Sequence, residues 1–242
     1  MTGRIAPWAR AHLLPWVRLP STWIEDGGLQ AFDWVAKEGG NRTAALMLLA
    51  VIAHHADRIT GKAQLTWDEL CAKSHLSRSK VSTGLMILAD KGIIERAPEG
   101  RSTFRLNNFG GENRWAMIPA RDMYSGGSIT AFRAFNLRLR AELDALKIYF
   151  LLATRRDNAT NQTLLSYEKI ELYSGVGRGF IRPALSLLAS HSLVHTTNKP
   201  STVDPYGISN VYRLVHLEPR RHPGTIGRNL EFEDGDGLGP SR

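Results

Sequence analysis

The sequence has a single cysteine, Cys71, among its 242 residues. One thiol cannot form a disulfide within the chain, and it cannot supply the thiolate cluster of a structural zinc site. No apolar run reaches the length that spans a bilayer, and prolines and arginines interrupt residues 1–20. We therefore expect a cytoplasmic protein with neither a membrane span nor a signal peptide.

The sequence also lacks the motifs of common catalytic sites. Gly-x-x-x-x-Gly-Lys-Ser/Thr is absent, which excludes a P-loop ATPase, and the glycines at 175–179 are expected to form a turn. His54 and His55 are neighbours, so they cannot face one metal ion from a helix. The acids Asp68, Glu69, Glu168 and Glu171 fall in or near first helical turns, where they favour the positive end of the helix. We therefore expect no catalytic residues, no metal, no cofactor and no enzymatic activity.

The charge balance is basic. Lys and Arg number 31 against 23 Asp and Glu, which gives a formal net charge of +8. The acidic stretch 231–236 hides part of this excess, so the rest of the chain is more basic than the total. A positive excess favours a polyanionic partner, because each phosphate that is neutralised releases condensed counterions.

The chain repeats itself at an offset of one hundred residues. Residues 65–70 (Leu-Thr-Trp-Asp-Glu-Leu) match 165–170 (Leu-Ser-Tyr-Glu-Lys-Ile) in class at every position except Glu69 against Lys169. The match continues without a gap into apolar positions at helical spacing, where Val81, Leu85 and Leu88 fall on Ile181, Leu185 and Leu188. A repeat of this length predicts two domains of one fold rather than a solenoid.

The first copy reads as three helices followed by a hairpin. Thr43, Thr66 and Ser77 are the predicted helix caps, and Glu69 completes a capping box with Thr66. The expected elements are a buried helix over 44–56, a short strand at 64–65, a helix after Thr66, a turn at 75–76, a helix after Ser77 and a hairpin pairing 93–97 with 103–107.

The second copy follows the same order with two departures. Apolar residues at spacings of three and four predict one long first helix over about 128–154. Pro183 falls near the start of the third helix and lacks a backbone N–H, so that helix is expected to start near Phe180. Ser166 is the predicted cap of the second helix, and the hairpin pairs 193–197 with 210–215.

These patterns predict a mainly α, α+β chain with small β-hairpins. A Trp-rich arm over 1–42 is expected to dock on the first domain, with a dimerisation or wrapping arm as the alternative. The expected divisions are a first domain over 43–107, a linker over 108–127 with an ordered strand or strap at 115–118, a second domain over 128–217 and a disordered tail over 218–242.

The order helix, strand, helix, turn, helix and hairpin is that of the winged-helix fold. Residues 76–85 (LSRSKVSTGL) resemble the turn and recognition helix of winged-helix DNA-binding proteins. Residues 88–94 (LADKGII) resemble the approach to the first wing strand in bacterial regulators and in phage and plasmid replication proteins. The resemblance covers 43–107 and 140–217. It implies two winged helix-turn-helix domains in tandem, an arrangement most similar to plasmid replication initiators.

The candidate DNA-binding residues follow from the fit of a helix into the major groove, where its first turns meet the base edges. In the first copy the positions outside the buried stripe are all able to hydrogen bond: Arg78, Ser79, Lys80, Ser82 and Thr83. In the second copy the candidates are Arg178, Arg182 and Phe180, the last for a thymine methyl or another protein surface. At the hairpin tips, Arg101 is a candidate phosphate or minor-groove contact and Lys199 is a candidate phosphate contact. The alternative for each is a solvated side chain that contacts nothing.

The resemblance implies sequence-specific binding of double-stranded DNA, as in a plasmid or mobile-element replication initiator. A transcriptional regulator bound to a promoter operator is the first alternative, and a winged-helix protein-interaction module is the second. The expected partners are duplex DNA, a second copy of the chain, and the replication or transcription machinery. The expected location is therefore the nucleoid, reached through the DNA.

Overall fold

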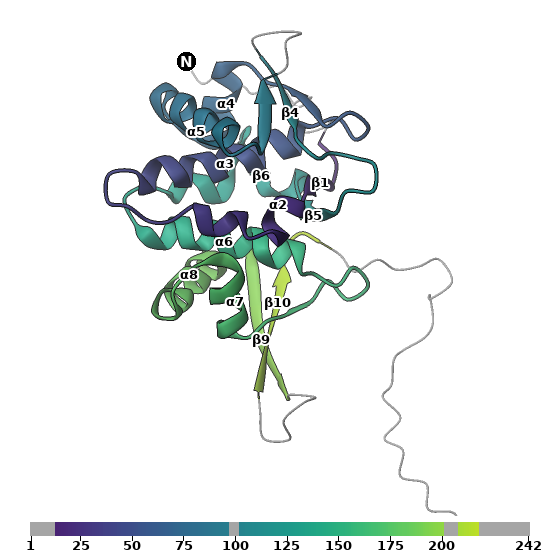
Figure 1. Cartoon of the computed structure of the whole chain (residues 1–242), viewed down its shortest axis with the longest axis vertical. Coiled ribbons are helices and arrows are strands. Elements are labelled where there is room, and N and C mark those ends of the chain that lie inside the picture. Colours follow the sequence, from purple (N-terminus) through teal and green to yellow (C-terminus); the bar gives the residue numbers. More distant parts are fainter. Residues whose placement is uncertain (1–12, 97–101, 201–207, 218–242) are drawn as a thin grey trace, which may run out of the picture.

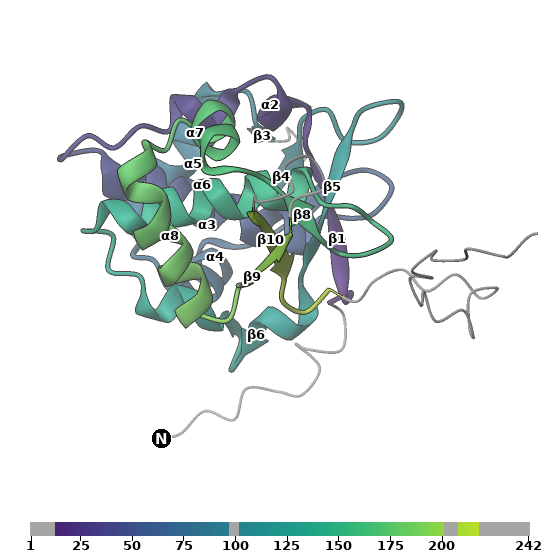
Figure 2. The same cartoon turned by 90° about the horizontal axis from the view of Figure 1, so that it is seen from below.

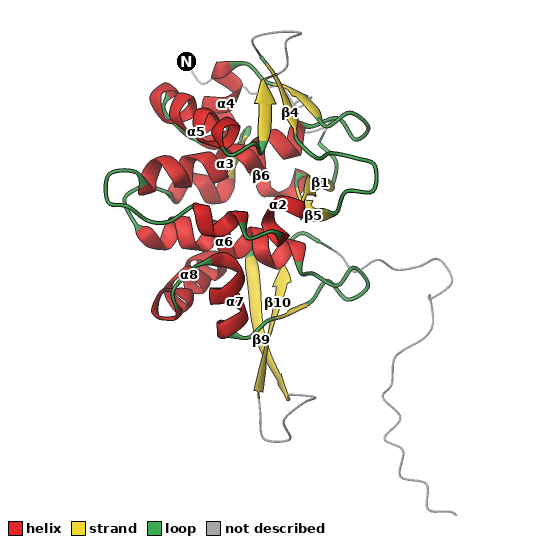
Figure 3. Cartoon of the chain, viewed as in Figure 1, coloured by secondary structure: helices red, strands yellow, loops and turns green. Residues whose placement is uncertain are grey.

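The computed structural model describes residues 13–96, 102–200 and 208–217 (Figure 1). It is an α+β structure with 47% helix, 19% strand and small antiparallel sheets, which confirms the predicted class. Helices α3 (Gly39–His55) and α6 (Arg140–Thr154) lie side by side in the middle, and one unit lies on each side of this pair (Figure 3).

The first unit follows the predicted order of elements. After α3 come β2 (Lys62–Gln64), α4 (Trp67–Ser74), α5 (Arg78–Asp90), β3 (Ile94–Arg96) and β4 (Thr103–Leu106). The strands form an antiparallel sheet in the order β2-β4-β3, so the predicted hairpin is confirmed. Its tip, residues 97–101, lies outside the described residues, and with it the candidate phosphate contact Arg101.

The second unit repeats this topology. After α6 come β8 (Thr163–Leu164), α7 (Tyr167–Ser174), α8 (Arg178–Ser190), β9 (Val194–Pro200) and β10 (Ile208–Leu214). The sheet order is β8-β10-β9, again antiparallel. Residues 61–70 and 161–170 also have the same succession of buried, half-buried and exposed side chains. The offset of one hundred residues is therefore a repeat of structure as well as of sequence.

The predicted helix caps are confirmed at three positions. The hydroxyl of Thr66 accepts a hydrogen bond from the N–H of Glu69, whose carboxylate accepts from the N–H of Thr66, the reciprocal capping box. The hydroxyls of Ser77 and Ser166 accept from the N–H groups of Lys80 and Lys169 in the same way. These caps satisfy N–H groups that have no partner within the helix.

Two predicted helix starts are wrong. Helix α3 begins at Gly39, one turn before the predicted cap Thr43, whose hydroxyl instead donates to the carbonyl of Gly39 inside the helix (2.9 Å). Helix α8 begins at Arg178 rather than near Phe180, so Pro183 lies inside it. The missing N–H of Pro183 leaves the carbonyl of Gly179 without its helical donor.

The long first helix predicted for the second copy is also wrong. Residues 128–139 form β7 (Ser128–Ile129), the short helix η3 (Thr130–Ala134) and a loop in which Leu137 has φ 64°. Helix α6 starts only at Arg140, because the carboxylate of Glu142 accepts from the N–H groups of Asn136 (2.7 Å) and Leu139 (3.4 Å). The buried side chains of Phe132 and Phe135 still join the core, which is why their spacing continues that of the helix.

The arm and the linker form a ribbon together. Strand β1 (Trp16–Pro20) pairs antiparallel with β5 (Trp115–Pro119), which confirms the predicted strand at 115–118. The remaining elements are α2 (Thr22–Glu25), η1 (Gly28–Ala31), η2 (Arg121–Met123) and β6 (Tyr124–Ser125). The amide of Gln30 donates to the carbonyl of Leu172 in α7 (2.8 Å). The arm contacts the first domain, as expected, where Nζ of Lys91 donates to the carbonyl of Ala31 (2.9 Å), and it contacts the second unit as well.

One hydrophobic core serves both units. All residues from Thr43 to His54 and from Glu142 to Ala153 are buried. The buried side chains of the two units belong to one continuous cluster, which includes the ribbon residues Val17, Leu19 and Ile118. Figure 2 shows α3 and α6 running through the centre of the molecule, with α8 on one side. The position of α5 relative to α8 is thus fixed by shared packing.

Candidate nucleic-acid interface

The first turn of α5 presents the polar side chains that the sequence predicts. Val81, Leu85 and Leu88 are fully buried, so the opposite face of the helix is turned to solvent. Arg78, Ser79 and Ser82 are exposed and Thr83 is half-buried. His75, with φ 60°, makes the tight turn from α4 that brings this helix to the surface.

Arg78 has a neighbour of opposite charge. Its Nη2 lies 2.5 Å from Oδ1 of Asp68 in α4, and the side chains are 73% and 82% exposed. An ion pair this open to water contributes little to stability, on the order of 0–1 kcal/mol. A phosphate or a guanine edge can therefore replace Asp68 as the partner of Arg78 at small cost.

Lys80 does not extend freely from the helix. Its Nζ donates to Oδ1 of Asn41 in the first turn of α3 (2.6 Å), and the side chain is half-buried. Gly84 lies one turn further along, where a Cβ would come within 2.7 Å of the Leu48 side chain. The two helices thus run close together from their first turns, and Lys80 joins those turns.

The first turn of α8 differs in chemistry from that of α5. Gly177 at its cap has no side chain, and the carboxylate of Glu171 accepts from the N–H of Arg178 instead (3.1 Å). Arg178 and Arg182 are exposed, as predicted. Phe180, at the position that matches Lys80, is 45% exposed, and the guanidinium of Arg140 lies 3.7 Å from its ring centroid. In the second unit, too, a side-chain contact links the first turn of the first helix, α6, with that of the third helix, α8.

The first turns of four helices meet on one side of the molecule. A Cβ on Gly40, at the start of α3, would lie 2.4 Å from the carbonyl oxygen of Leu137, just before α6. The contacts of Lys80 with Asn41 and of Arg140 with Phe180 add α5 and α8 to this pair. The partial positive charge at the helix N-termini therefore points to the same side as the basic side chains.

Charged side chains also fill the seam between α3 and α6. Arg42 pairs with Asp33, and Nε of Arg140 donates to Oδ2 of Asp144 (3.0 Å). Lys147 is only 1% exposed between these pairs, and burial lowers its pKa to about 8. Sequence reasoning missed Asn41, Arg140 and Lys147, because their roles depend on which turns meet in space. The apolar Phe180 on an exposed face was the one signal in the sequence.

The β9–β10 hairpin carries the remaining candidate. Lys199 is exposed on β9, and its Nζ donates to Oε1 of Gln162 across the sheet (3.0 Å). Lys199 is the last residue but one of β9 and pairs with Ser209, so it lies near the outer end of the β9–β10 hairpin. This hairpin projects from the second unit in Figure 1. The hairpins of the two units lie at opposite ends of the molecule in that view.

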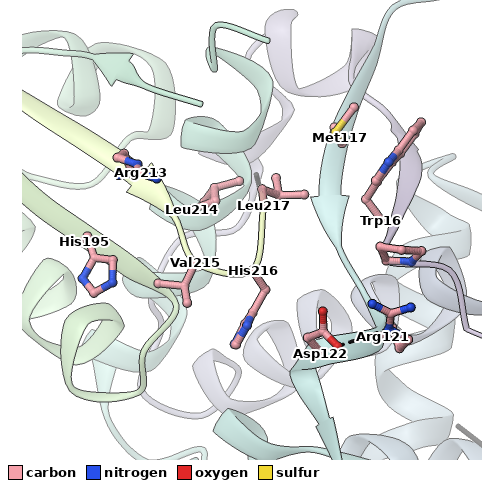
Figure 4. Close-up of a pocket in the computed structure, with 11 residues that line it drawn as sticks. Trp16, Met117, Arg121, Asp122, His195, Arg213, Leu214, Val215, His216 and Leu217 are labelled. Atoms are coloured by element: carbon pink, nitrogen blue, oxygen red, sulfur yellow. Dashed lines mark hydrogen bonds and ion pairs between the residues drawn. The ribbon is translucent and has the colours of Figure 1, made fainter. Parts of the chain in front are cut away.

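A cavity of about 630 Å³ opens away from this interface, between the β1–β5 ribbon and the base of the β9–β10 hairpin (Figure 4). Trp16 and Arg121 lie on one side of it, and His195 and Arg213 lie on the other. Arg121 is paired with Asp122 (3.2 Å). The lining of the cavity combines the side chains of His195, His216, Arg121, Arg213 and Asp122 with apolar side chains.

The two neighbouring histidines have separate environments. His54 is buried, and its Nδ1 lies 3.1 Å from the hydroxyl of Tyr124. Burial, and then the charge of His55, lower the pKa of His54 to about 3, so it is neutral at pH 7. Within the described ranges no three His, Cys, Asp or Glu side chains are grouped to hold a metal ion. Over the same residues, no helix has the length and apolarity to cross a membrane.

Comparison with protein-family models and with curated proteins gives no match to this chain. The functional proposal therefore depends on the geometry of the two units.

Proposed function

We propose that the chain binds double-stranded DNA sequence-specifically through two tandem winged helices, in which α5 and α8 are the recognition helices. Each unit has the element order of a winged helix, with a three-stranded antiparallel sheet whose last two strands form the wing. The net charge of +8 suits a polyanion.

The observation that carries the proposal is the meeting of the first turns of α3, α5, α6 and α8 on one side. The first turns of a recognition helix are the part that meets base edges. With both on one side, a single chain can address two major-groove segments of one duplex, about 34 Å apart.

The candidate side chains differ in the roles that we propose for them. Arg78, Arg178 and Arg182 are long enough to reach guanine O6 and N7 or a phosphate. Ser79, Ser82 and Thr83 are shorter donors and acceptors for the backbone or an adjacent base. Lys80, held by Asn41, positions α5, and Lys199 contacts phosphate from the wing.

The proposed biological role is that of a replication initiator of a plasmid or mobile element. The tandem layout supports it, and directly repeated binding sites beside a replication origin would follow from it. An inverted repeat that overlaps a promoter would instead assign a transcriptional regulator. Absence of specific DNA binding would leave a protein-interaction module. A second copy of the chain and the replication machinery are the proposed protein partners.

The test is the affinity of the full chain for fragments of its own replicon at physiological salt. We expect one class of fragment to bind at least a thousandfold more tightly than unrelated DNA. The double variant Arg78→Ala/Arg178→Ala should lose about 2–6 kcal/mol of specific binding, at about 1–3 kcal/mol per base contact. Equal binding of the variant and the wild type would refute the assignment.

A control for the loss of a positive charge elsewhere on the surface is Arg121→Ala, compared with each single variant, Arg78→Ala and Arg178→Ala. Arg121 is three residues before Tyr124, and the ring of Tyr124 contacts His54 in the last turn of α3. Arg121 therefore lies near the C-terminal end of α3, whereas Asn41 and the proposed interface are at its N-terminal end. Its removal takes away one positive charge outside the proposed interface. We expect it to leave the preference for the specific fragment unchanged.

A further inference from the structure

Arg140 is held in place from two directions. Its Nε donates to Oδ2 of Asp144 at 3.0 Å, and Asp144 is only 2% exposed. The face of its guanidinium lies over the ring of Phe180, 3.7 Å from the centroid. Even so, the Arg140 side chain remains 35% exposed.

These contacts leave part of the guanidinium available. A guanidinium has five N–H donors in a planar fork, and the carboxylate of Asp144 accepts from Nε. In the described residues, no hydrogen bond uses the Nη groups of Arg140. Stacking on a ring holds the plane of the fork, so less side-chain entropy remains to be lost when a ligand binds.

Comparison of the two units shows what Arg140 replaces. In each unit a cation links the first turns of the first and third helices. In the first unit this cation is Lys80 on the third helix, α5, which donates to Asn41 of α3. In the second unit the third helix has Phe180 at the matching position, and the cation comes from α6. The positive charge is thus kept at the same place although it comes from a different helix.

Arg140 also lies at the seam between the two units. Burial lowers the pKa of Lys147, and the charges of Asp144 and Arg140 on its own helix, of Asp33 in the arm and of Arg42 in α3 act on it as well. Leu137, three residues before Arg140, also lies against Gly40 of α3, so the start of α6 is at the junction of the two units, between the proposed recognition helices.

We propose that Arg140 binds a backbone phosphate of the duplex between the two major-groove segments. This inference rests on the proposed DNA-binding function. The ring of Phe180 supports the guanidinium, and the Nη groups donate in fork geometry to the phosphate oxygens. Phe180 is then a positioning residue rather than a base reader.

The test compares Arg140→Gln with Arg138→Gln, which removes the same charge from an exposed side chain two residues earlier. Affinity is measured against salt concentration for the specific fragment and for unrelated duplex DNA. We expect Arg140→Gln to reduce the log–log slope by about 0.9 and to lower both affinities roughly tenfold. Arg138→Gln should change the slope by clearly less.

The inference would be overturned if folded Arg140→Gln had the affinity and the salt slope of the wild type. It would also be overturned if Arg140→Gln and Arg138→Gln lost affinity and slope equally. A third contrary result is an affinity loss in Arg140→Gln that depends on the base at a single position of the DNA site. If the wild type itself fails to bind the duplex specifically, the proposed function fails, which is a separate outcome.

A second variant keeps the test valid if Arg140→Gln unfolds because Asp144 loses its partner. Phe180→Leu removes only the supporting ring from a 45% exposed position and leaves the ion pair intact. We expect a severalfold loss of affinity with an unchanged salt slope, because no charge is lost. Unchanged affinity in this variant would contradict the support role of the ring.

Discussion

At the residue scale, His54 ties the stability of the protein to pH. Its pKa in the folded protein is about 3, below the 6.5 of an exposed histidine. Between these values the unfolded chain binds a proton that the folded protein excludes, so stability is complete above pH 6.5 and is lost as the pH falls.

The measurement is the free energy of urea unfolding at pH 7 and at pH 4.5. We expect a loss of about 2.5 kcal/mol from His54 alone, since one pKa unit corresponds to about 1.4 kcal/mol. The half-buried His55, with a pKa of about 4, adds to it. The variant His54→Leu should show a shallower dependence. An equally steep dependence in that variant would contradict the assignment.

The buried Lys147 leads to a second prediction, on the effect of removing a buried charge. Burial lowers its pKa from 10.5 to about 8, so the charged side chain costs stability at pH 7. A methionine of similar length fills the same space without a charge. We expect Lys147→Met to gain about 2 kcal/mol in urea unfolding at pH 7 and less at pH 10, where the lysine is largely neutral when folded. A destabilised variant at pH 7 would show that Lys147 is needed as the partner of Asp144.

At the element scale, two glycines in matching helices behave differently. Gly84 in α5 faces α3, and a Cβ there would lie 2.7 Å from Leu48 Cδ1 and 3.1 Å from the backbone nitrogen of Ala45. Gly179 in α8 has nothing within 4 Å of its Cβ position. We expect Gly84→Ala to cost about 1–3 kcal/mol through overpacking. Gly179→Ala should gain up to about 1 kcal/mol of helix propensity.

Urea unfolding of both variants at neutral pH measures these two effects. Because each change adds one methyl group to a helix, each variant is the control for the other. Equal effects would contradict the close packing of α3 against α5.

Local signals in the sequence predicted most elements. The hydroxyls of Thr66, Ser77 and Ser166 and the carboxylate of Glu69 accept from N–H groups three residues away, so their pattern in the sequence is enough. The break before α6 was missed for a different reason. Apolar spacing continues through Phe132 and Phe135 because both are buried, although the chain there is not an α-helix.

At the scale of the whole molecule, the sequence predicted the repeat but not how the copies are joined. The seam depends on the contact of Gly40 with the carbonyl of Leu137 and on the charges around Lys147. These residues are far apart in the sequence and belong to no local pattern. The predicted candidates Arg78, Arg178 and Arg182 are exposed as expected, whereas Lys80 and Phe180 turned out to hold helices together.

Joining the units through one core has a consequence for the proposed DNA recognition. If α5 and α8 are fixed relative to each other, the spacing of the two DNA segments that we propose they bind is fixed as well. Little conformational entropy is then lost when the second helix enters its groove after the first.

The most direct measurement is a hydroxyl-radical footprint of the full chain on its specific fragment at physiological salt. The account predicts two protected segments about one helical turn apart on the same face of the duplex, from one bound chain. A single protected segment, or two on opposite faces, would contradict the claim that both units read one duplex from the same side.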